Sequence, residues 1–264
     1  PGSLPTITKN RTTLPASVIR RADSDIVYVL DEYSTDPTVI TQADKIELSY
    51  DKINSVYGDH AGVISQDVAG DMIIKWLTGL PQANIGKTTG GNTSELGNSN
   101  MTGTRKVLIH QDIRKFMRSF NAANVPQNDR TCLLPAYMID QLLDSLSNTQ
   151  YRDFSQYMNA KEGIVGRLYT FDIIMRSDVA TVNSVDTTPT VNPYGAVAGT
   201  ADSECALLWQ KDAVARALGE VKFFENLDRA EYQGDLYSSY LRAGGRRRRA
   251  DSLGVGMLVQ ATGS

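Results

Sequence analysis

Few side chains in this sequence have the types and spacing that enzyme chemistry needs. The chain has two histidines, His60 and His110, and two cysteines, Cys132 and Cys205. No cluster of Cys, His, Asp and Glu has metal-ligand spacing, and no Gly-x-Ser-x-Gly nucleophile motif occurs. Each cysteine lies in an apolar run, TCLL or ECALLW, which indicates a buried, unreactive thiol. We therefore expect no catalytic residue, no metal site, no cofactor and no enzymatic activity.

The segment IGKTTGG at residues 85–91 invites comparison with a phosphate-binding loop. That motif needs a glycine five positions before Gly86, where this chain has Pro81. A proline supplies neither the backbone N–H nor the turn, and no predicted strand directly precedes the segment. We therefore interpret 85–91 as part of a solvated loop.

The densest charge cluster is Arg246, Arg247, Arg248 and Arg249, which follow Gly244 and Gly245. Arginine forks bind carboxylates or phosphates, so the cluster fits either acidic side chains at a subunit boundary or the backbone of DNA. The chain has 27 basic and 30 acidic residues and a net charge of -3, whereas proteins that grip nucleic acid over a broad face are usually basic. This balance favours a turn whose four arginines lie at a subunit boundary.

Composition indicates a globular chain. It has 264 residues, of which 41% are hydrophobic, and this is enough for one large core or two moderate ones. No apolar run approaches the roughly 18 residues of a membrane span, and the first residues do not have a signal-peptide pattern. Two cysteines make no disulfide framework and fit a reducing compartment.

The start of the chain, up to Tyr57, predicts an extended arm and a long two-stranded excursion. Residues 1–24 lack periodicity and read as an arm. Residues 26–30 and 46–53 read as strands, and the second alternates Ile46, Leu48 and Tyr50 with polar residues. An isolated hairpin cannot bury such an apolar face, so we expect these three residues to contact an adjacent subunit.

Two amphipathic helices are predicted next, over 59–78 and 104–123. The first has an apolar face with Ile64, Val68, Met72 and Trp76, and the second one with Ile113, Phe116 and Phe120. We expect these two faces to pack against each other. The segment between them, 81–103, is rich in Gly, Asn, Thr and Ser and reads as a loop.

The remaining half mixes strands and helices, so the fold class is α+β. Strands are predicted at 131–135, 166–175, 204–209, 219–227 and 255–261, helices at 136–146 and 211–218, and a loop at 181–200.

The order of these segments resembles the major capsid proteins of tailed double-stranded-DNA bacteriophages, the Hong Kong 97-type shell fold. The resemblance is strongest in HQDIRKFMRSFNAANVPQNDRTCLLPAYMIDQLL, and it continues in GRLYTFDIIMRSDV and in ALLWQKDAVARALGEVKFFENL. It implies four parts: an N-terminal arm (1–25), an extended loop (26–57), a peripheral domain with the long helix (58–129 and 252–264) and an axial domain (130–251).

The same resemblance implies a structural protein of the virion that is assembled in the bacterial cytoplasm. Its copies would form the pentamers and hexamers of an icosahedral shell around DNA, without sequence-specific DNA binding and without a membrane. Scaffold, portal and decoration proteins are further partners that it allows. Three alternatives remain open: an encapsulin-like compartment shell, a small α+β hydrolase or ligand-binding protein, and a nucleic-acid-binding module.

Overall fold

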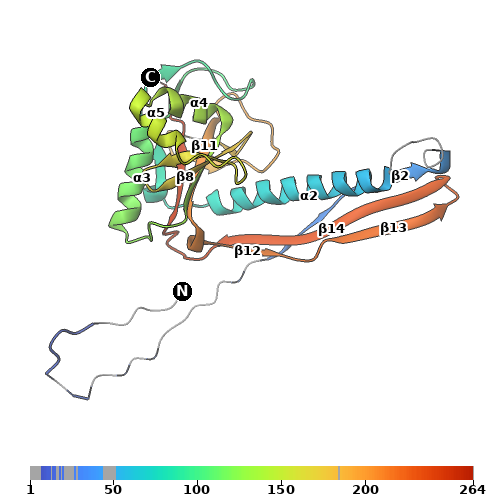
Figure 1. Cartoon of the computed structure of the whole chain (residues 1–264), viewed down its shortest axis with the longest axis horizontal. Coiled ribbons are helices and arrows are strands. Elements are labelled where there is room, and N and C mark those ends of the chain that lie inside the picture. The colour runs from blue at the N-terminus through green and yellow to red at the C-terminus, as the bar shows by residue number, and fades with distance from the viewer. Residues whose placement is uncertain are drawn as a thin grey trace.

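The computed structural model describes residues 7–12, 14, 15, 18, 20, 27, 29–43, 52–183 and 185–263. Within them the chain has an elongated part and a compact part (Figure 1). We call the elongated part the blade, which consists of residues 29–43, 52–77 and 214–247. We call the compact part the body, which consists of residues 78–183, 185–213 and 248–263.

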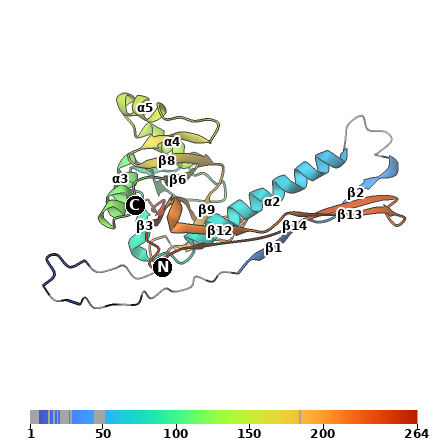
Figure 2. The same ribbon diagram turned by 60° about the horizontal axis from the view of Figure 1, so that its bottom comes forward.

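The blade is a helix that lies along a long sheet (Figures 1 and 2). Helix α2 (Lys52–Leu77) has 26 residues, and the central strand β14 (Gly234–Arg247) has 14. At the usual rise per residue, each is about 40–45 Å long. Strands β1 (Asp31–Ser34) and β2 (Thr38–Thr41) pair with one edge of β14, and β12 (Val214–Leu218) and β13 (Lys222–Arg229) with the other, all antiparallel.

An apolar stripe holds α2 against the sheet. Ile64, Val68 and Met72 recur every fourth residue and pack on Leu241 and Ala243 of β14. The helix and the strand approach each other so closely at Gly245 that a Cβ atom there would overlap the Met72 sulfur. Gly245 is therefore part of a strand that packs tightly under a helix, and not part of a turn.

Polar contacts fasten the β1–β2 connection to the same helix. The Tyr33 hydroxyl donates to Asp71, whose carboxylate also accepts from Lys75 at 2.9 Å. The buried His60 ring lies between two threonine hydroxyls, 2.6 Å from Thr35 Oγ1 and 2.8 Å from Thr38 Oγ1. These contacts fix the edge of the blade sheet relative to α2.

The body is built on an eight-stranded sheet with β11 (Ser203–Gln210) at its centre. On one side, β15 (Val255–Val259) pairs with β11 and β3 (Ile85–Lys87) pairs with β15. On the other side, β9 (Ala180–Asn183) pairs with the first half of β11 and β6 (Arg130–Pro135) with the second half. Beyond β6 follow β8 (Phe171–Arg176) and β7 (Ile164–Leu168), and beyond β9 follows the short β10 (Thr190–Val191).

Three helices cover one face of this sheet: α3 (His110–Ala122), α4 (Ala136–Asp144) and α5 (Asn148–Ser155). A short two-stranded sheet of β4 (Asn92–Thr93) and β5 (Arg105–Lys106) precedes α3. Alternate residues of the central strands point to the two faces, so that Leu208 joins the core under the helices and Leu207 joins the opposite core. The opposite core also receives Ile73 and Leu77 from the end of α2.

The body therefore holds the end of the blade. The last turns of α2 are buried in the body core. In addition, the Tyr194 ring packs directly on Gly70 of α2, in the space that a Cβ atom there would occupy. The Arg176 guanidinium lies 5.8 Å from the centre of that ring and donates to the Gln66 carbonyl at 3.3 Å. The blade is thus attached firmly at one end and projects at the other (Figure 2).

Several predicted elements are confirmed. The structure has helices within 104–123 and 136–146, and strands within 131–135, 204–209, 219–227 and 255–261. Both cysteines are fully buried and free, as their apolar surroundings predicted. The α+β class is confirmed as well.

Other predicted elements were wrong. Residues 211–218 form a 3-10 turn and strand β12, because pairing with β14 outweighs the helix propensity of alanine. The single strand over 166–175 is a hairpin, which turns at Tyr169 with a φ of 57°. The loops at 81–103 and 181–200 contain short strands, and residues 85–87 form β3, beside β15.

The predicted two-stranded excursion differs too. Val27 and Val29 are exposed and lie outside any strand, and Ile53 belongs to α2, which begins before the predicted start at Asp59. Strands β1 and β2 pair with β14 and not with each other. The backbone N–H and C=O groups of β1 and β2 pair with β14, near the other end of the sequence. No local sequence pattern predicts a pairing between segments so far apart.

The two predicted helices do not pack face to face. Ile64, Val68 and Met72 face β14, whereas Ile113 and Phe116 lie in the core under α3 and α4. Helix α3 and strand β15 lie in the body. Strands β12, β13 and β14 belong to the blade with α2. The division of the chain into a peripheral and an axial domain stays a prediction.

Candidate assembly surfaces

Of the residues predicted to contact other subunits, Ile46, Leu48 and Tyr50 lie outside the described residues. The four arginines are described, and the structure separates their roles. Arg246 and Arg247 are the last two residues of β14, and Arg248 and Arg249 begin the turn after it.

Arg247 points back into its own chain and binds the end of α2. Its guanidinium donates to the carbonyl oxygens of Trp76 at 2.9 Å, Thr78 at 2.5 Å and Gly79 at 3.1 Å. These carbonyls have no partner within the helix, and a cation there complements the negative end of the helix dipole. Burial lowers the pKa of Arg247, and the neighbouring charge of Arg246 lowers it further. Arg247 is therefore a helix cap.

The other three arginines are exposed. Arg249 Nη2 lies 2.7 Å from Asp251 Oδ2, and this hydrogen bond lowers the pKa of the Asp251 carboxyl. Arg246 donates to the carbonyl of Val27, and Arg248 to that of Asp212 at 3.4 Å. All three guanidinium groups thus lie at the surface, and one of them, that of Arg249, is paired with an acidic side chain of its own chain.

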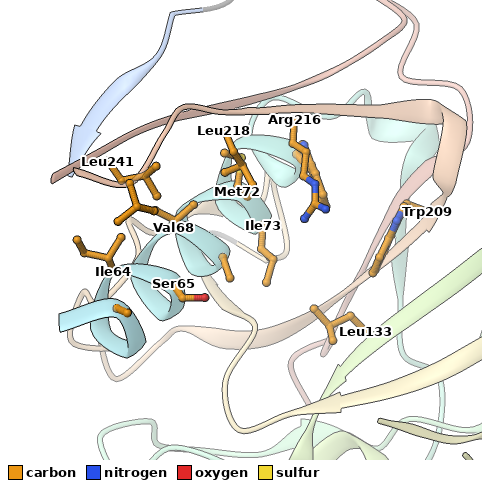
Figure 3. A pocket seen from close by; sticks show the side chains of 14 residues that line it. Ile64, Ser65, Val68, Met72, Ile73, Leu133, Trp209, Arg216, Leu218 and Leu241 are labelled. Atoms are coloured by element: carbon orange, nitrogen blue, oxygen red, sulfur yellow. The ribbon is translucent and has the colours of Figure 1, made fainter. Parts of the chain in front are cut away.

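An apolar groove runs between α2, the blade sheet and the body (Figure 3). Its volume is about 440 Å³. Side chains from all three parts point into it: Ile64, Val68, Met72, Ile73, Trp76, Leu133, Trp209, Leu218 and Leu241. The Trp76 and Trp209 rings lie 6.0 Å apart at its body end, and Trp76 Nε1 has no hydrogen-bond partner in the part of the chain that the structure describes.

Further apolar side chains are exposed along the blade and the arm. Phe224, Leu227 and Tyr232 are each more than half exposed, and β13 has no pairing partner on its outer edge among the described strands. In the arm, Ile7 and Val18 are more than 90% exposed. Large uncovered apolar surface and an open strand edge are typical of surfaces that other chains cover.

Sequence reasoning missed the groove and the outer edge of β13. The stretch KFFENL did have a usable signal, because its consecutive apolar residues put Phe223 and Phe224 on opposite faces of one strand. Phe223 packs on Tyr57 and Tyr237 beneath α2, and Phe224 on the other face is left exposed. The groove had no signal, since it forms between segments that lie far apart in the sequence.

The described residues contain no group of three or more His, Cys, Asp and Glu side chains that is placed to hold a metal ion. None of the helices within the described ranges is long and apolar enough to cross a membrane. The Gly-rich segment at 85–91 serves packing, because the Phe116 ring fills the space above Gly86 and Gly256 on neighbouring strands.

No family model and no curated protein sequence matches this chain. Solved structures of phage capsids do match it, over nearly its whole length. A chain from the structure of Mycobacterium phage Che8 has a TM-score of 0.56 and 18% identity, covering 97% of this chain and 81% of that one. The capsid of cyanophage P-SCSP1u gives a TM-score of 0.60 at 21% identity, covering 99% of this chain and 81% of that one.

The mature capsid of bacteriophage PhiM1 also gives a TM-score of 0.60, at 15% identity, covering 98% of this chain and 80% of that one. At such identities the likeness is one of fold, and it includes both the blade and the body. The chain therefore has the Hong Kong 97-type fold of these capsid subunits.

Proposed function

We propose that this chain is the major capsid protein of a tailed double-stranded-DNA bacteriophage. Copies of it assemble into the pentamers and hexamers of an icosahedral shell, and its role in the virion is structural and not enzymatic. The observation that carries this proposal is the apolar surface of the blade, which the described residues leave uncovered on a fold shared with phage capsids.

The physical argument concerns burial. Among the described residues, α2 covers one face of the blade sheet, and Phe224 and Val39 are exposed on the other face. Covering such surface stabilises an assembly by about 25 cal/mol per Å² before the entropy of association is subtracted. Because each subunit of a shell has several neighbours, interfaces that are weak one by one give a stable particle together.

We assign the parts of the fold accordingly. The blade is the peripheral domain and the body is the axial domain, which surrounds the centre of a pentamer or hexamer. The arm (1–25) and the tip of the predicted loop (26–57), with Ile46, Leu48 and Tyr50, reach adjacent subunits. Arg246, Arg248 and Arg249 present guanidinium groups at a boundary between subunits, whereas Arg247 stabilises its own chain.

Partners other than identical copies follow from the same proposal. The shell encloses packaged DNA without reading its sequence, and scaffold, portal and decoration proteins are the further partners. The assembly takes place in the cytoplasm of the host bacterium. An encapsulin-like shell would differ in its content, because its particles would contain protein cargo and no nuclease-protected DNA.

Sedimentation velocity of the purified chain tests the proposal. We expect a fast, homogeneous species that negative-stain microscopy shows as closed particles. Phe224→Asp places a charge on the exposed face of β13 and should leave only small, folded species. Phe224→Leu is the matched control, because it keeps an apolar side chain and should still assemble. If the unmodified chain stays monomeric under all assembly conditions, the proposal is wrong.

A further inference from the structure

A short segment of the body lies over the central strand of its sheet. We call residues 94–104, which connect β4 to β5, the lid. At its start, the lid is held by the Tyr137 hydroxyl, which donates to the Glu95 carbonyl. At its end, Thr102 N–H donates to the Thr200 carbonyl at 2.9 Å, and the Thr104 carbonyl accepts from Arg105 at 3.0 Å and from Gly263 N–H at 2.8 Å. Met101 is buried, but most other lid residues are exposed. The middle of the lid, residues 96–100, makes no hydrogen bond to the rest of the described chain, so we infer that it can move without unfolding the sheet.

The lid covers the carboxyl group of Glu204, on β11. Glu204 is 7% exposed, and the lid backbone lies so close above it that a Cβ atom at Gly97 would overlap Oε1. A methyl group at Gly97 would force either the lid or the Glu204 carboxyl group to move. Gly97 itself is exposed, so lifting the lid would bring the carboxyl group into contact with water.

Within the described part of the chain, no positive charge compensates this carboxyl group. Glu204 Oε2 is buried and has no hydrogen-bond partner among the described residues. Its electrostatic neighbour is an acid, Asp178, on the connection between β8 and β9. Arg105 is buried beside Ser203, the neighbour of Glu204, but its guanidinium donates to Ser203 Oγ and to the carbonyls of three residues, Asp202, Thr102 and Thr104.

The other titratable groups beside Glu204 do not offset its charge. Cys205 is buried on the opposite face of β11, and burial raises the pKa of its thiol, so that it stays neutral. The Asp202 carboxylate accepts from Asn192 Nδ2 and Gly199 N–H, both at 2.8 Å. An ionised Glu204 under the closed lid would therefore be a buried, unpaired charge beside another acid, which is strongly unfavourable.

We propose that Glu204 is a proton-dependent latch: the lid closes over the neutral carboxyl group and opens when that group releases its proton to water. Burial raises the pKa of Glu204 to about 7, and the negative charge of Asp178 raises it as well. The transition therefore falls near neutral pH. This inference is independent of the proposed shell function, because it concerns one segment within a single chain.

The direction of the pH effect follows from proton linkage. The closed lid holds the proton more strongly than the open lid does, so closure is favoured at low pH and weakens as the pH rises from about 4.5 to about 7. From these two pKa values, the equilibrium constant for closure should fall roughly 30-fold between pH 5.5 and pH 8.5.

Hydrogen–deuterium exchange of the full chain tests the latch. Protection of peptides from residues 94–104, corrected for the intrinsic effect of pH on exchange, should fall roughly 30-fold between pH 5.5 and pH 8.5. Glu204→Gln has no proton to lose and should keep the lid protected at both pH values. Glu220→Gln, at an exposed acid, is the matched control and should behave like the unmodified chain.

Gly97→Ala provides a second variant, which should expose the lid at both pH values because its methyl group displaces the lid from Glu204. Equal lid protection of the unmodified chain at both pH values would overturn the proposal. So would an unchanged pH dependence in Glu204→Gln. A lid that stays protected at pH 8.5 only when Mg²⁺ or Ca²⁺ is added, and loses protection with a chelator, would also overturn it in favour of a cation site.

Discussion

Arg130 shows how a single residue organises the body. It is fully buried, and its guanidinium donates to neutral oxygens only: the carbonyls of Val125 and Pro126, Asn121 Oδ1 and Thr170 Oγ1, all at 2.7–2.9 Å. The rings of Phe120 and Phe171 lie 5.5 and 5.9 Å away. Five donors in a rigid fork thus join the end of α3 to β6 and to the β7–β8 turn.

We expect Arg130→Met to lower the free energy of unfolding by about 3 kcal/mol or more, because it leaves several buried oxygens without a donor. Arg130→Lys should not restore the loss, since one ammonium cannot reach all four acceptors. Arg167→Met is the control: its ion pair with Asp172 is partly exposed and should contribute about 0–1 kcal/mol. Urea denaturation of the three variants compares these values, and equal losses for Arg130 and Arg167 would contradict this role.

Glu204 gives a pH dependence of stability with a definite sign. Its pKa is raised from 4.5 to about 7 in the folded chain, so its contribution is most favourable below pH 4.5 and is lost as the pH rises to about 7. At about 1.4 kcal/mol for each tenfold change in proton affinity, the loss between pH 4 and pH 8 is at most about 3 kcal/mol. Glu204→Gln should therefore be more stable than the unmodified chain at pH 8 and similar to it at pH 4. Chemical denaturation at both pH values measures the difference.

At the scale of elements, the sequence predicted the helices and strands whose own residues carry a clear apolar pattern. Strand β6 and helix α4 were predicted correctly because the apolar residues of each are contiguous or regularly spaced and are buried in one core. Strand β12 was missed because AVARAL suits a helix as well, and its pairing partner β14 lies beyond the next strand of the sequence. The arginine run was recognised as a cluster, but its sequence could not reveal that Arg247 binds the end of a helix in the first third of the chain.

The packing of α3 on the sheet depends on two glycines. A methyl group at Gly256 would lie 2.5 Å from the Phe116 ring, and one at Gly86 would lie 2.6 Å from it. We expect Gly256→Ala to lower stability by about 1–3 kcal/mol through overpacking. Combining it with Phe116→Leu should cost less than the sum of the two single changes, because the smaller side chain makes room. A double-mutant cycle measures this coupling, and strict additivity would show that the ring does not constrain these positions.

The end of α2 depends on its arginine cap. Arg247→Met should lower the melting temperature and speed amide exchange in the last turn of α2, with a loss of about 1–2 kcal/mol for the carbonyl contacts. Arg248→Met is the control, because that exposed guanidinium makes only one long contact at 3.4 Å and should matter by less than about 0.5 kcal/mol. Similar losses for both variants would mean that general charge, and not capping, stabilises this junction.

At the scale of the whole molecule, the chain joins a well-packed body to a thin blade. The body buries its sheet on both faces, whereas the blade has one helix over one face and an apolar groove along its side. The sequence predicted the class of fold and its resemblance to phage capsids, but it did not predict that β1 and β2 pair with β14 beside α2. Their pairing joins segments near opposite ends of the sequence, and such pairing has no local signature.

The most direct test of the proposed function is a cryo-electron microscopy reconstruction of particles formed by this chain. A capsid subunit predicts closed icosahedral shells with pentamers and hexamers, in which neighbouring chains cover Phe224 and the groove beside Trp76. Assembly into filaments or sheets, or a monomer whose groove holds a small molecule, would contradict the account.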